Sequence, residues 1–330
     1  MKTVSVIVPV YNLEALLPGM ANSLLEQDYP ALQVIFSDDG SRDGSRNMLE
    51  EIARKDDRVL VISGENGGVS AARNRALQAA TGDYIAFADG DDQLEPGYFS
   101  ALVSALEESG ADMACCGYTR IYEKTGKEER LPLGQHPRQT ADRNGMERLL
   151  LRPDGYTLVL WNKLFRREAL TDDVGALMRF DETLHIVEDG EYIFRSRVKT
   201  AVFLPDALYR YYVRSSGAMY ASTVSERKLT ELPARKKIIA LTSGSSDEVR
   251  ALAKMKYQKS VRDLMFHAVI CGQGAKVKHL RPELKVYRKE LFASSALSKK
   301  EKLKYHIYYP LILLNLRHLG AFLMERLSGH

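Results

Sequence analysis

Carboxylates gather behind two runs of the sequence that are typical of buried strands. Asp38 and Asp39 follow LQVIFS, and Asp89, Asp91 and Asp92 follow YIAFA. Helix capping and turn formation explain about one aspartate in each cluster, but a second carboxylate repels the first and needs a cation or a hydrogen-bond donor beside it. Such hard oxygen ligands suit Mg²⁺ or Mn²⁺, which complete their shell with water and phosphate oxygens. The sequence therefore predicts that a divalent ion and a diphosphate share this charge.

Two further stretches carry residues capable of chemistry. HIVEDGEYIFR places Glu188, Asp189 and Glu191 just before a helical run, and taken alone this is typical of an acidic helix start that favours the helix dipole. NGGVSAARNRAL, at 66–77, is a glycine pair followed by a helix that carries Arg73, and alone it is a good helix start. The P-loop ending and the Gly-x-Gly-x-x-Gly spacing are absent, which argues against an NTPase and a nicotinamide enzyme.

The elements that must position these residues alternate in type. Over the first hundred residues, strand-like runs (VSVIVPV, LQVIFS, RVLVIS, DYIAFAD) are separated by runs of helical period. This repeat predicts a mostly parallel sheet covered by helices. Each of the four strands ends in a polar cluster, and ligands of such sheets lie beyond the carboxyl ends of the strands. The four clusters therefore indicate one crevice.

Composition describes an ordinary globular chain. Of 330 residues, 45% are hydrophobic and 27% charged, which fits one large domain or two modest ones. The three cysteines show neither a disulfide framework nor a zinc spacing, which favours a reducing compartment. The amino terminus lacks the features of a secretion signal, and no stretch reaches the roughly 18 apolar residues of a membrane span. These observations predict a cytosolic chain or one peripheral to a membrane.

The second half of the chain is less regular and ends in a basic region. Residues 131–144 have a loop-like composition with two prolines. From about residue 225 the sequence becomes basic and helical, and residues 251–330 carry 16 Lys and Arg against 5 Asp and Glu. The first 250 residues sum to a charge of −7 and the last 80 to +11. The two regions are therefore expected to face different partners.

Seven motifs occur in a characteristic order. They are SVIVPVYN at 5–12, DDGSRDGS at 38–45, NGGVSAARNRAL at 66–77, YIAFADGDD at 84–92, WNKLFRRE at 161–168, FDETLHIVEDGEYIFR at 180–195 and YRYYVRSSGAM at 209–219. In this order and spacing the chain resembles the family-two glycosyltransferases of the GT-A fold, the bacterial nucleotide-sugar enzymes that build capsule, O-antigen and exopolysaccharide. The resemblance implies an α/β, Rossmann-like, mostly parallel sheet flanked by helices, with an α-helical carboxyl-terminal extension.

The resemblance also implies a donor site for a UDP-sugar. The residues similar to those that hold the nucleotide are Pro9, Tyr11, Asp38, Asp39, Asn66 and Arg73, the last being similar to the family's nucleobase-contacting arginine. Asp89-Gly90-Asp91 stands where the family has Asp-x-Asp, whose second carboxylate ligates Mn²⁺ or Mg²⁺ bridging the two phosphates, and Asp92 completes the Asp-x-Asp-Asp form. Gly90 replaces the commoner Ser or Ala and leaves the carboxylates intact.

An acceptor hydroxyl is a poor nucleophile until a base takes its proton. By resemblance Asp189 occupies the position of that base, with Glu188 as its neighbour. Trp161 and Asn162 are similar to residues near the acceptor or donor sugar, although filling the core is the alternative for Trp161.

One further stretch is assigned by the resemblance. Arg210, Arg214 and Ser216 lie in a segment that folds over the diphosphate in related enzymes, with solvated loop arginines as the alternative.

The basic tail has two interpretations. Lys299, Lys300, Lys302 and Lys304 precede the apolar stretch YHIYYPLILLNLRHLGAFLMERL, a composition that suits a helix in a membrane interface beside anionic headgroups. The alternative is a helix that closes the domain core or a homodimer interface. No nucleic-acid motif accompanies the basic charge, so a nucleic acid is not expected as a partner.

Together these patterns predict a catalytic GT-A domain over residues 1–222, with a nucleotide-sugar half at about 1–120 and an acceptor half at about 121–222, followed by a basic helical region at 223–330. The resemblance implies an inverting, metal-dependent transfer of a hexosyl or N-acetylhexosaminyl group from a UDP-sugar to a hydroxyl of a glycan, and we expect this glycan to be linked to polyprenyl diphosphate at the cytoplasmic face of the membrane. A sugar nucleotidyltransferase and a non-catalytic, membrane-docked protein of the same fold are the alternatives.

Overall fold

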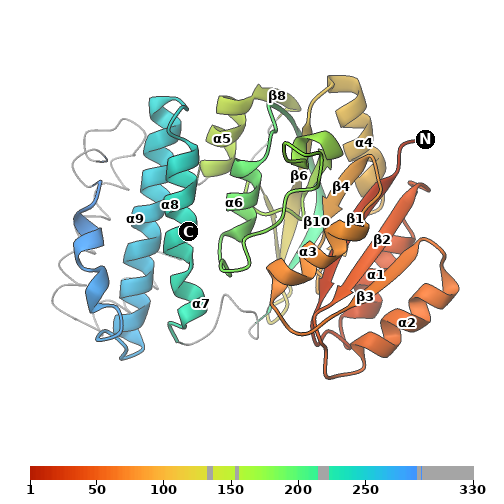
Figure 1. Cartoon of the computed structure of the whole chain (residues 1–330), viewed down its shortest axis with the longest axis horizontal. Coiled ribbons are helices and arrows are strands. Elements are labelled where there is room, and N and C mark those ends of the chain that lie inside the picture. The colour runs from red at the N-terminus through yellow and green to blue at the C-terminus, as the bar shows by residue number, and fades with distance from the viewer. Residues whose placement is uncertain (132–136, 153–155, 215–222, 288–290, 292–330) are drawn as a thin grey trace. The chain divides into compact units, whose positions relative to one another are not determined.

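The computed structural model describes residues 1–131, 137–152, 156–214, 223–287 and 291 (Figure 1). The chain divides into two compact units, Met1–Ser215 and Ser216–His330. The first unit contains the sheet and all of the described residues that the sequence singles out for chemistry. Ser216 and the lysines at 299–304 lie outside the described residues.

The first unit is built on one mixed sheet. Its strand order is β3-β2-β1-β4-β9-β6-β10-β5, with β7 paired to β6 and β8 paired to β10. The strands are β1 (Val4–Val10), β2 (Leu32–Asp38), β3 (Val59–Ser63), β4 (Tyr84–Phe87), β5 (Gln93–Leu94), β6 (Met113–Tyr122), β7 (Lys127–Leu131), β8 (Gln139–Asp142), β9 (Lys163–Arg166) and β10 (Thr200–Val213). The first four are parallel neighbours, as the sequence predicts.

The helices of this unit flank the sheet. They are α1 (Leu17–Leu25), α2 (Ser45–Lys55), α3 (Val69–Ala79), α4 (Tyr98–Ser109), α5 (Arg143–Leu151), the short 3₁₀ helix η1 (Arg167–Leu170) and α6 (Glu188–Arg195). Strand β1 is buried on both faces, at Val6 on one and at Ile7 on the other, as is usual for parallel strands that helices cover on both sides. The predicted α/β fold with a helix-flanked sheet is confirmed.

The loop expected over 131–144 is an exception to that agreement. Strand β8 lies within it and pairs antiparallel with the first residues of β10, from Thr200 to Phe203. Its sequence, QTAD, has alternate residues exposed and lacks the apolar run of a central strand. Pairing with β10, which is distant in sequence, therefore decides its conformation, and local composition does not reveal it.

The second unit is helical in the part that the structure describes. It consists of α7 (Glu226–Leu229), α8 (Glu231–Leu241), α9 (Asp247–Ile270), η3 (Lys278–Leu280) and η4 (Pro282–Lys285). Its own apolar core includes Leu232, Tyr257, Val261 and Leu284. Among the described residues, no helix combines the length and the apolar character needed to cross a bilayer.

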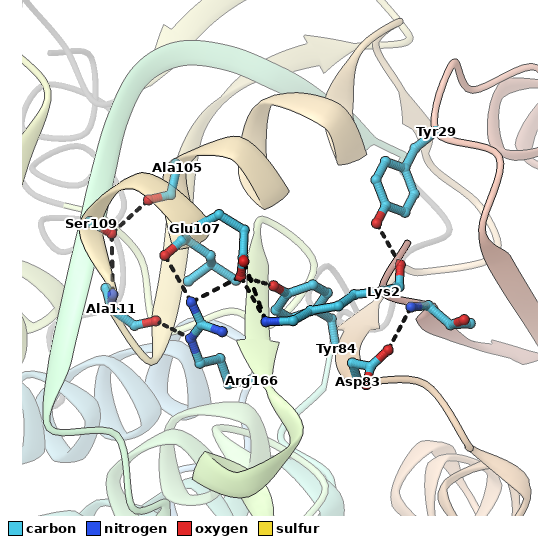
Figure 2. Close-up of polar contacts among 11 residues, drawn as sticks. Lys2, Tyr29, Asp83, Tyr84, Ala105, Glu107, Ser109, Ala111 and Arg166 are labelled. Atoms are coloured by element: carbon cyan, nitrogen blue, oxygen red, sulfur yellow. Dashed lines mark hydrogen bonds and ion pairs between the residues drawn. The ribbon is translucent and has the colours of Figure 1, made fainter.

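The amino-terminal end of the central strands is held by a polar cluster around Glu107 (Figure 2). Its carboxylate accepts hydrogen bonds from the Lys2 ammonium at 3.1 Å and from the Tyr84 hydroxyl, and it pairs with Arg166 at 3.1 Å. The hydrogen bonds from Tyr84 and Lys2 lower the pKa of Glu107 to about 2. This cluster connects α4 to β4 and β9 at one end of these strands, and the aspartates at 89–92 follow the other end of β4.

We expect Glu107→Gln to lower the free energy of unfolding at pH 7 by about 1 kcal/mol or less, because solvent screens a half-exposed ion pair. The pKa of Glu107 in the folded chain lies below the value of about 4.3 in an unfolded chain. The stabilisation is therefore present above about pH 4 and disappears as the pH falls towards 2. Chemical denaturation of both proteins at pH 7 and pH 3 measures it.

Glu50→Gln is the matched control, because Glu50 forms only an exposed ion pair with Arg46 on α2. A difference between Glu107→Gln and the native chain that grows as the pH falls would contradict the assignment.

Candidate active site

The guanidinium of Arg73, on α3, brings two distant acidic segments together. Its Nη1 lies 2.6 Å from Oδ1 of Asp189 and 3.3 Å from Oε1 of Glu188, and its Nη2 lies 3.2 Å from Oδ1 of Asp89. Arg73 is only 3% exposed, and its guanidinium also lies 5.4 Å from the centre of the Phe180 ring. The aspartate cluster after β4 and the acidic start of α6 therefore share one buried cation.

Burial and mutual repulsion shape the ionisation of this cluster. Burial raises the pKa of Asp89 to about 6, with Arg73 opposing the rise. Burial, and then repulsion by Asp189, raise the pKa of Glu188 to about 8. Burial by itself would lower the pKa of Arg73, but the three carboxylates raise it above its usual value. Arg73 therefore stays charged at neutral pH, and burial favours the neutral form of Glu188.

The aspartates after β4 are fixed from the side of β10. The Tyr209 hydroxyl donates to Oδ2 of Asp92 at 3.1 Å, and the Tyr212 amide donates to Oδ1 at 2.9 Å. The Asp89 amide in turn donates to the Tyr209 hydroxyl oxygen at 3.1 Å. Asp92 is 2% exposed. Because both of its carboxylate oxygens accept these hydrogen bonds, Asp92 stabilises the local fold. Asp91 is different, because its side chain is 41% exposed and, among the residues that the structure describes, its ion-pair partner is Arg214, at 3.3 Å.

Gly90 is required by close packing between these aspartates. A Cβ atom at this position would lie 2.9 Å from the carbonyl oxygen of Pro9 and 2.8 Å from Cδ1 of Leu13. Neither approach is tolerated without movement of the backbone or of the leucine. The glycine therefore allows the aspartate segment to pass close to the end of β1.

Three adjacent strand ends form the part of the rim assigned to the nucleotide. Asp39, after β2, accepts hydrogen bonds from the amides of Gly67 and Gly68 at 3.0 and 2.8 Å and from Nη2 of Arg75 at 2.6 Å. Asp38 accepts from the amide of Ser41 at 3.1 Å. These bonds hold the loop after β3 against the end of β2. On either side of Asp39, two residues are exposed, Tyr11 and Asn66.

The two residues expected near the sugar, Trp161 and Asn162, lie in the interior. Trp161 is 4% exposed and stacks on the rings of Tyr209 and Tyr211, with centroid distances of 4.4 and 5.5 Å. Asn162 is buried, and its amide donates to the carbonyl oxygen of Cys116 at 2.8 Å. Both residues thus support β10 and β6 from within the core.

Arg210 lies apart from the Arg73 cluster. It pairs with Glu95 at 3.1 Å and with Glu128 at 3.4 Å. Of the described arginines assigned to the diphosphate loop, only Arg214 contacts the aspartates after β4.

A metal ion at this site would need oxygen ligands from substrate or water in addition to the protein carboxylates. Within the described part of the chain, no group of three or more His, Cys, Asp or Glu side chains converges as a ready-made metal site. Asp91 and Asp89 nevertheless present carboxylate oxygens at the rim, with side chains 41% and 32% exposed. One or two carboxylates, with substrate phosphates and water, are the usual ligand set of Mg²⁺. The donor set therefore fits a divalent ion that arrives with a diphosphate.

Asn74, one residue after Arg73, is a member of the site that the sequence does not single out. Its Oδ1 accepts from the Phe180 amide at 2.7 Å, and its Nδ2 donates to the Phe180 carbonyl at 3.1 Å and to Glu182 at 2.8 Å. These bonds attach the segment leading to Asp189 to α3. No local pattern could reveal them, because the partners are more than 100 residues apart.

The entry to α6 is conformationally strained. Val187, which precedes Glu188, has φ of 67° and therefore lies in the left-handed region, where a β-branched residue is a clear outlier. Such strain persists only where surrounding contacts over-determine the conformation. The attachments of Asn74 and Arg73 to this segment supply such contacts.

We expect Asn74→Asp to lower the free energy of unfolding by about 1–3 kcal/mol, because the carbonyl of Phe180 loses its donor and a second carboxylate is placed beside Glu182. Thermal or chemical denaturation measures the change. Asn22→Asp, at an exposed position on α1, is the control and should be nearly neutral. Equal effects of the two substitutions would show that the bonds to Phe180 do not stabilise the fold.

Known proteins resemble this chain in sequence. The chain is 31% identical over 213 residues to the uncharacterized glycosyltransferase EpsJ of Bacillus subtilis, a match that covers 63% of this chain and 60% of EpsJ. It is 34% identical over 113 residues to a GalNAc(5)-diNAcBac-PP-undecaprenol beta-1,3-glucosyltransferase of Campylobacter jejuni, covering 34% of this chain and 37% of that protein. The chain thus spans about three fifths of the length of EpsJ, and less of the Campylobacter protein.

Two solved structures share the fold. Residues 1–349 of S. aureus TarS, in complex with UDP-GlcNAc, superpose with a TM-score of 0.67 at 20% identity, covering 94% of this chain and 92% of TarS. The mannosyltransferase PcManGT of Pyrobaculum calidifontis, in complex with GDP-Man and Mn²⁺, gives a TM-score of 0.56 at 18% identity, covering all of this chain and 88% of that one. The family model for glycosyl transferase family 2 matches residues 5–173, more than half of the 330 residues. The chain therefore belongs to glycosyl transferase family 2.

Proposed function

We propose that this chain is an inverting glycosyltransferase that moves a sugar, a hexosyl or N-acetylhexosaminyl group, from a UDP-sugar to a hydroxyl of a glycan acceptor. The observation that carries the proposal is the Arg73 cluster. One guanidinium holds Asp89, from the segment assigned to the donor diphosphate, and Asp189, assigned to the acceptor. A transferase needs these two groups on either side of the bond that breaks.

The nucleotide belongs, in this proposal, at the ends of β1, β2 and β3. In this proposal the exposed ring of Tyr11 offers a face for the uracil, and Pro9, Asp38, Asp39 and Asn66, from the same strand ends, complete the site. TarS, whose fold this chain shares, binds UDP-GlcNAc, which supports a uridine donor. Because Arg73 forms ion pairs with three carboxylates, we place its side chain beside the reacting groups and not at the nucleobase.

Mn²⁺ or Mg²⁺ fits the proposed donor site. Asp91 would hold the ion, with Asp89 as a second ligand, and Asp92 would keep the segment in place through Tyr209. PcManGT binds Mn²⁺ together with its sugar nucleotide, which supports metal dependence. When bound, the ion neutralises charge on the leaving diphosphate. Arg214 pairs with Asp91 in this structure and brings a second positive charge to the same edge of the site.

The base in this proposal is Asp189. Its Oδ1 is held by Arg73, and its Oδ2 accepts a hydrogen bond from the amide of Leu160 at 3.1 Å. Burial and repulsion by Asp189 raise the pKa of Glu188 to about 8, which favours the neutral form of Glu188 and so reduces repulsion between the two carboxyl groups. Asp189 takes the proton of the acceptor hydroxyl as that oxygen attacks the anomeric carbon and the bond to UDP breaks. Attack opposite the leaving group inverts the configuration, so an α-linked donor yields a β-linkage.

In this proposal the acceptor follows from the name of a relative, and the location follows from the basic charge of residues 223–330. A polyprenyl-diphosphate-linked glycan is supported by the undecaprenol-linked substrate in the name of the Campylobacter relative. We propose that residues 1–222 catalyse the transfer and that the basic region 223–330 brings the chain to the anionic cytoplasmic face of a membrane. Its exposed cations include Lys236, Lys237, Lys259, Lys278 and Arg281. A homodimer contact is the alternative role of this region.

Calorimetric titration with UDP tests the donor site. We expect binding in the presence of Mn²⁺ and a loss of at least about 10-fold in affinity on chelation or in Asp91→Ala, because the diphosphate then lacks its counter-charge. Asp57→Ala, at an exposed position after α2, should bind like the native chain. UDP binding that is indifferent to both the metal and Asp91 would contradict the metal assignment, and no binding would favour the non-catalytic alternative.

Transfer by Asp189→Asn tests the base. We expect kcat to fall by about 10²–10⁴-fold, the usual contribution of general base catalysis, while UDP affinity is unchanged because Asp189 lies outside the nucleotide rim. Asp206→Asn, at an exposed position in β10, is the control. Full transfer activity in Asp189→Asn would exclude the mechanism, and the coupling constant of the anomeric proton in the product would show whether the configuration inverts.

A further inference from the structure

Lys163, the first residue of β9, is a buried cation that the proposed reaction does not use directly. Its side chain is 0% exposed. Its ammonium donates to the carbonyl oxygens of Thr157 and Val159 at 2.8 and 2.6 Å and to Oδ1 of Asn162 at 2.8 Å. An ammonium has three protons, so all of its hydrogen-bonding capacity is spent on the preceding loop.

The loop, residues 156–162, has no regular secondary structure and needs such donors. Backbone carbonyls that are buried outside helices and sheets must find partners elsewhere. Besides the two carbonyls held by the ammonium, the amide of Lys163 donates to the Leu160 carbonyl at 3.0 Å, and the Tyr98 hydroxyl donates to the Trp161 carbonyl at 2.8 Å. Lys163 thus binds this loop through both its ammonium and its backbone amide.

The loop at 156–162 places one hydrogen-bond donor beside the proposed base. The amide of Leu160, directly after Val159, points to Oδ2 of Asp189 at 3.1 Å, while Arg73 holds Oδ1 of the same carboxylate at 2.6 Å. Rotation of the carboxylate would break one of these two bonds. Its orientation towards an acceptor therefore depends on Arg73 from one element and on the loop around Lys163 from another.

The buried positive charge of Lys163 indicates a role other than packing. Burial lowers the pKa of Lys163, whereas Cys115 and Asp189 oppose that shift. An apolar side chain would fill the same volume without the cost of burying a cation, but it would leave two loop carbonyls without donors.

We propose that Lys163 is a positioning residue for the transfer reaction, holding the Leu160 amide on Asp189. The inference rests on the proposed function, because it takes Asp189 as the base. Lys163 touches neither the donor nor the acceptor in this proposal. Its effect is therefore on the geometry of the base and leaves nucleotide binding unchanged.

The kinetic test compares two cations on the same strand. Lys163→Met removes the ammonium, and Arg166→Met removes a guanidinium that donates to the carbonyls of Ala111 and Leu106 at 2.8 and 2.9 Å, at the opposite end of β9 (Figure 2). We expect kcat of Lys163→Met to fall by about 10- to 100-fold, because misplacing a reacting group by about 1 Å has effects of this size. KM for the donor and UDP affinity should stay within about 2-fold.

Arg166→Met should lower the melting temperature without lowering kcat. An unchanged kcat in Lys163→Met, or an equal loss of kcat in Arg166→Met, would overturn the inference. If Asp189→Asn keeps its activity, the proposed function fails and the role of Lys163 fails with it. If Asp189→Asn is inactive and Lys163→Met is fully active, only the inference fails.

A spectroscopic test needs no substitution at Lys163. In chain labelled with ¹⁵N-leucine, the Leu160 amide should change its chemical shift in Asp189→Asn, because its acceptor loses its charge. No response of this amide in folded Asp189→Asn would show that the link to the base is absent and would overturn the inference. The same resonance should shift in Lys163→Met, or in Lys163→Gln if the methionine variant does not fold, and should stay in place in Arg166→Met.

Discussion

The arrangement of the candidate site depends on the burial of one cation. A guanidinium that is almost wholly removed from water must be paired, and Arg73 finds its partners in Asp89, Glu188 and Asp189. The carboxylates need the arginine equally, because three acids brought together without it would repel one another. This mutual requirement joins the end of β4 to the start of α6 across 100 residues of intervening chain.

The remaining contacts of the site serve to hold those partners. Asn74 fixes the segment before α6 to the same face of α3 from which Arg73 reaches out. Tyr209 holds Asp92 and the Asp89 amide from β10. Trp161 stacks on that tyrosine, so an aromatic residue assigned to a sugar contact acts in this structure through the core. The stability of the sheet and the geometry of the site are thus supported by the same side chains.

The electrostatic balance of the site explains how it can accept an anionic substrate. Arg73 is occupied by three carboxylates, and Arg214 faces Asp91 at the rim. The carboxylates outnumber the cations, and burial raises the pKa of both Asp89 and Glu188. In the function that we propose, a divalent ion relieves this excess, and the ion and Arg214 together supply positive charge to the diphosphate.

The sequence by itself determined the α/β class and the mostly parallel sheet, because hydrophobic period and turn chemistry are local properties. The family was indicated by the resemblance of its seven ordered motifs. The sequence also placed the aspartates at the ends of strands, since each cluster directly follows an apolar run. Only the tertiary structure decided which of those residues meet. The bonds of Asn74 to Phe180, the wrapping of a loop around Lys163, the engagement of Asp92 by β10 and the strand β8 all join segments through side-chain or edge contacts. Such contacts depend on how the elements pack, and no local pattern of residues encodes them.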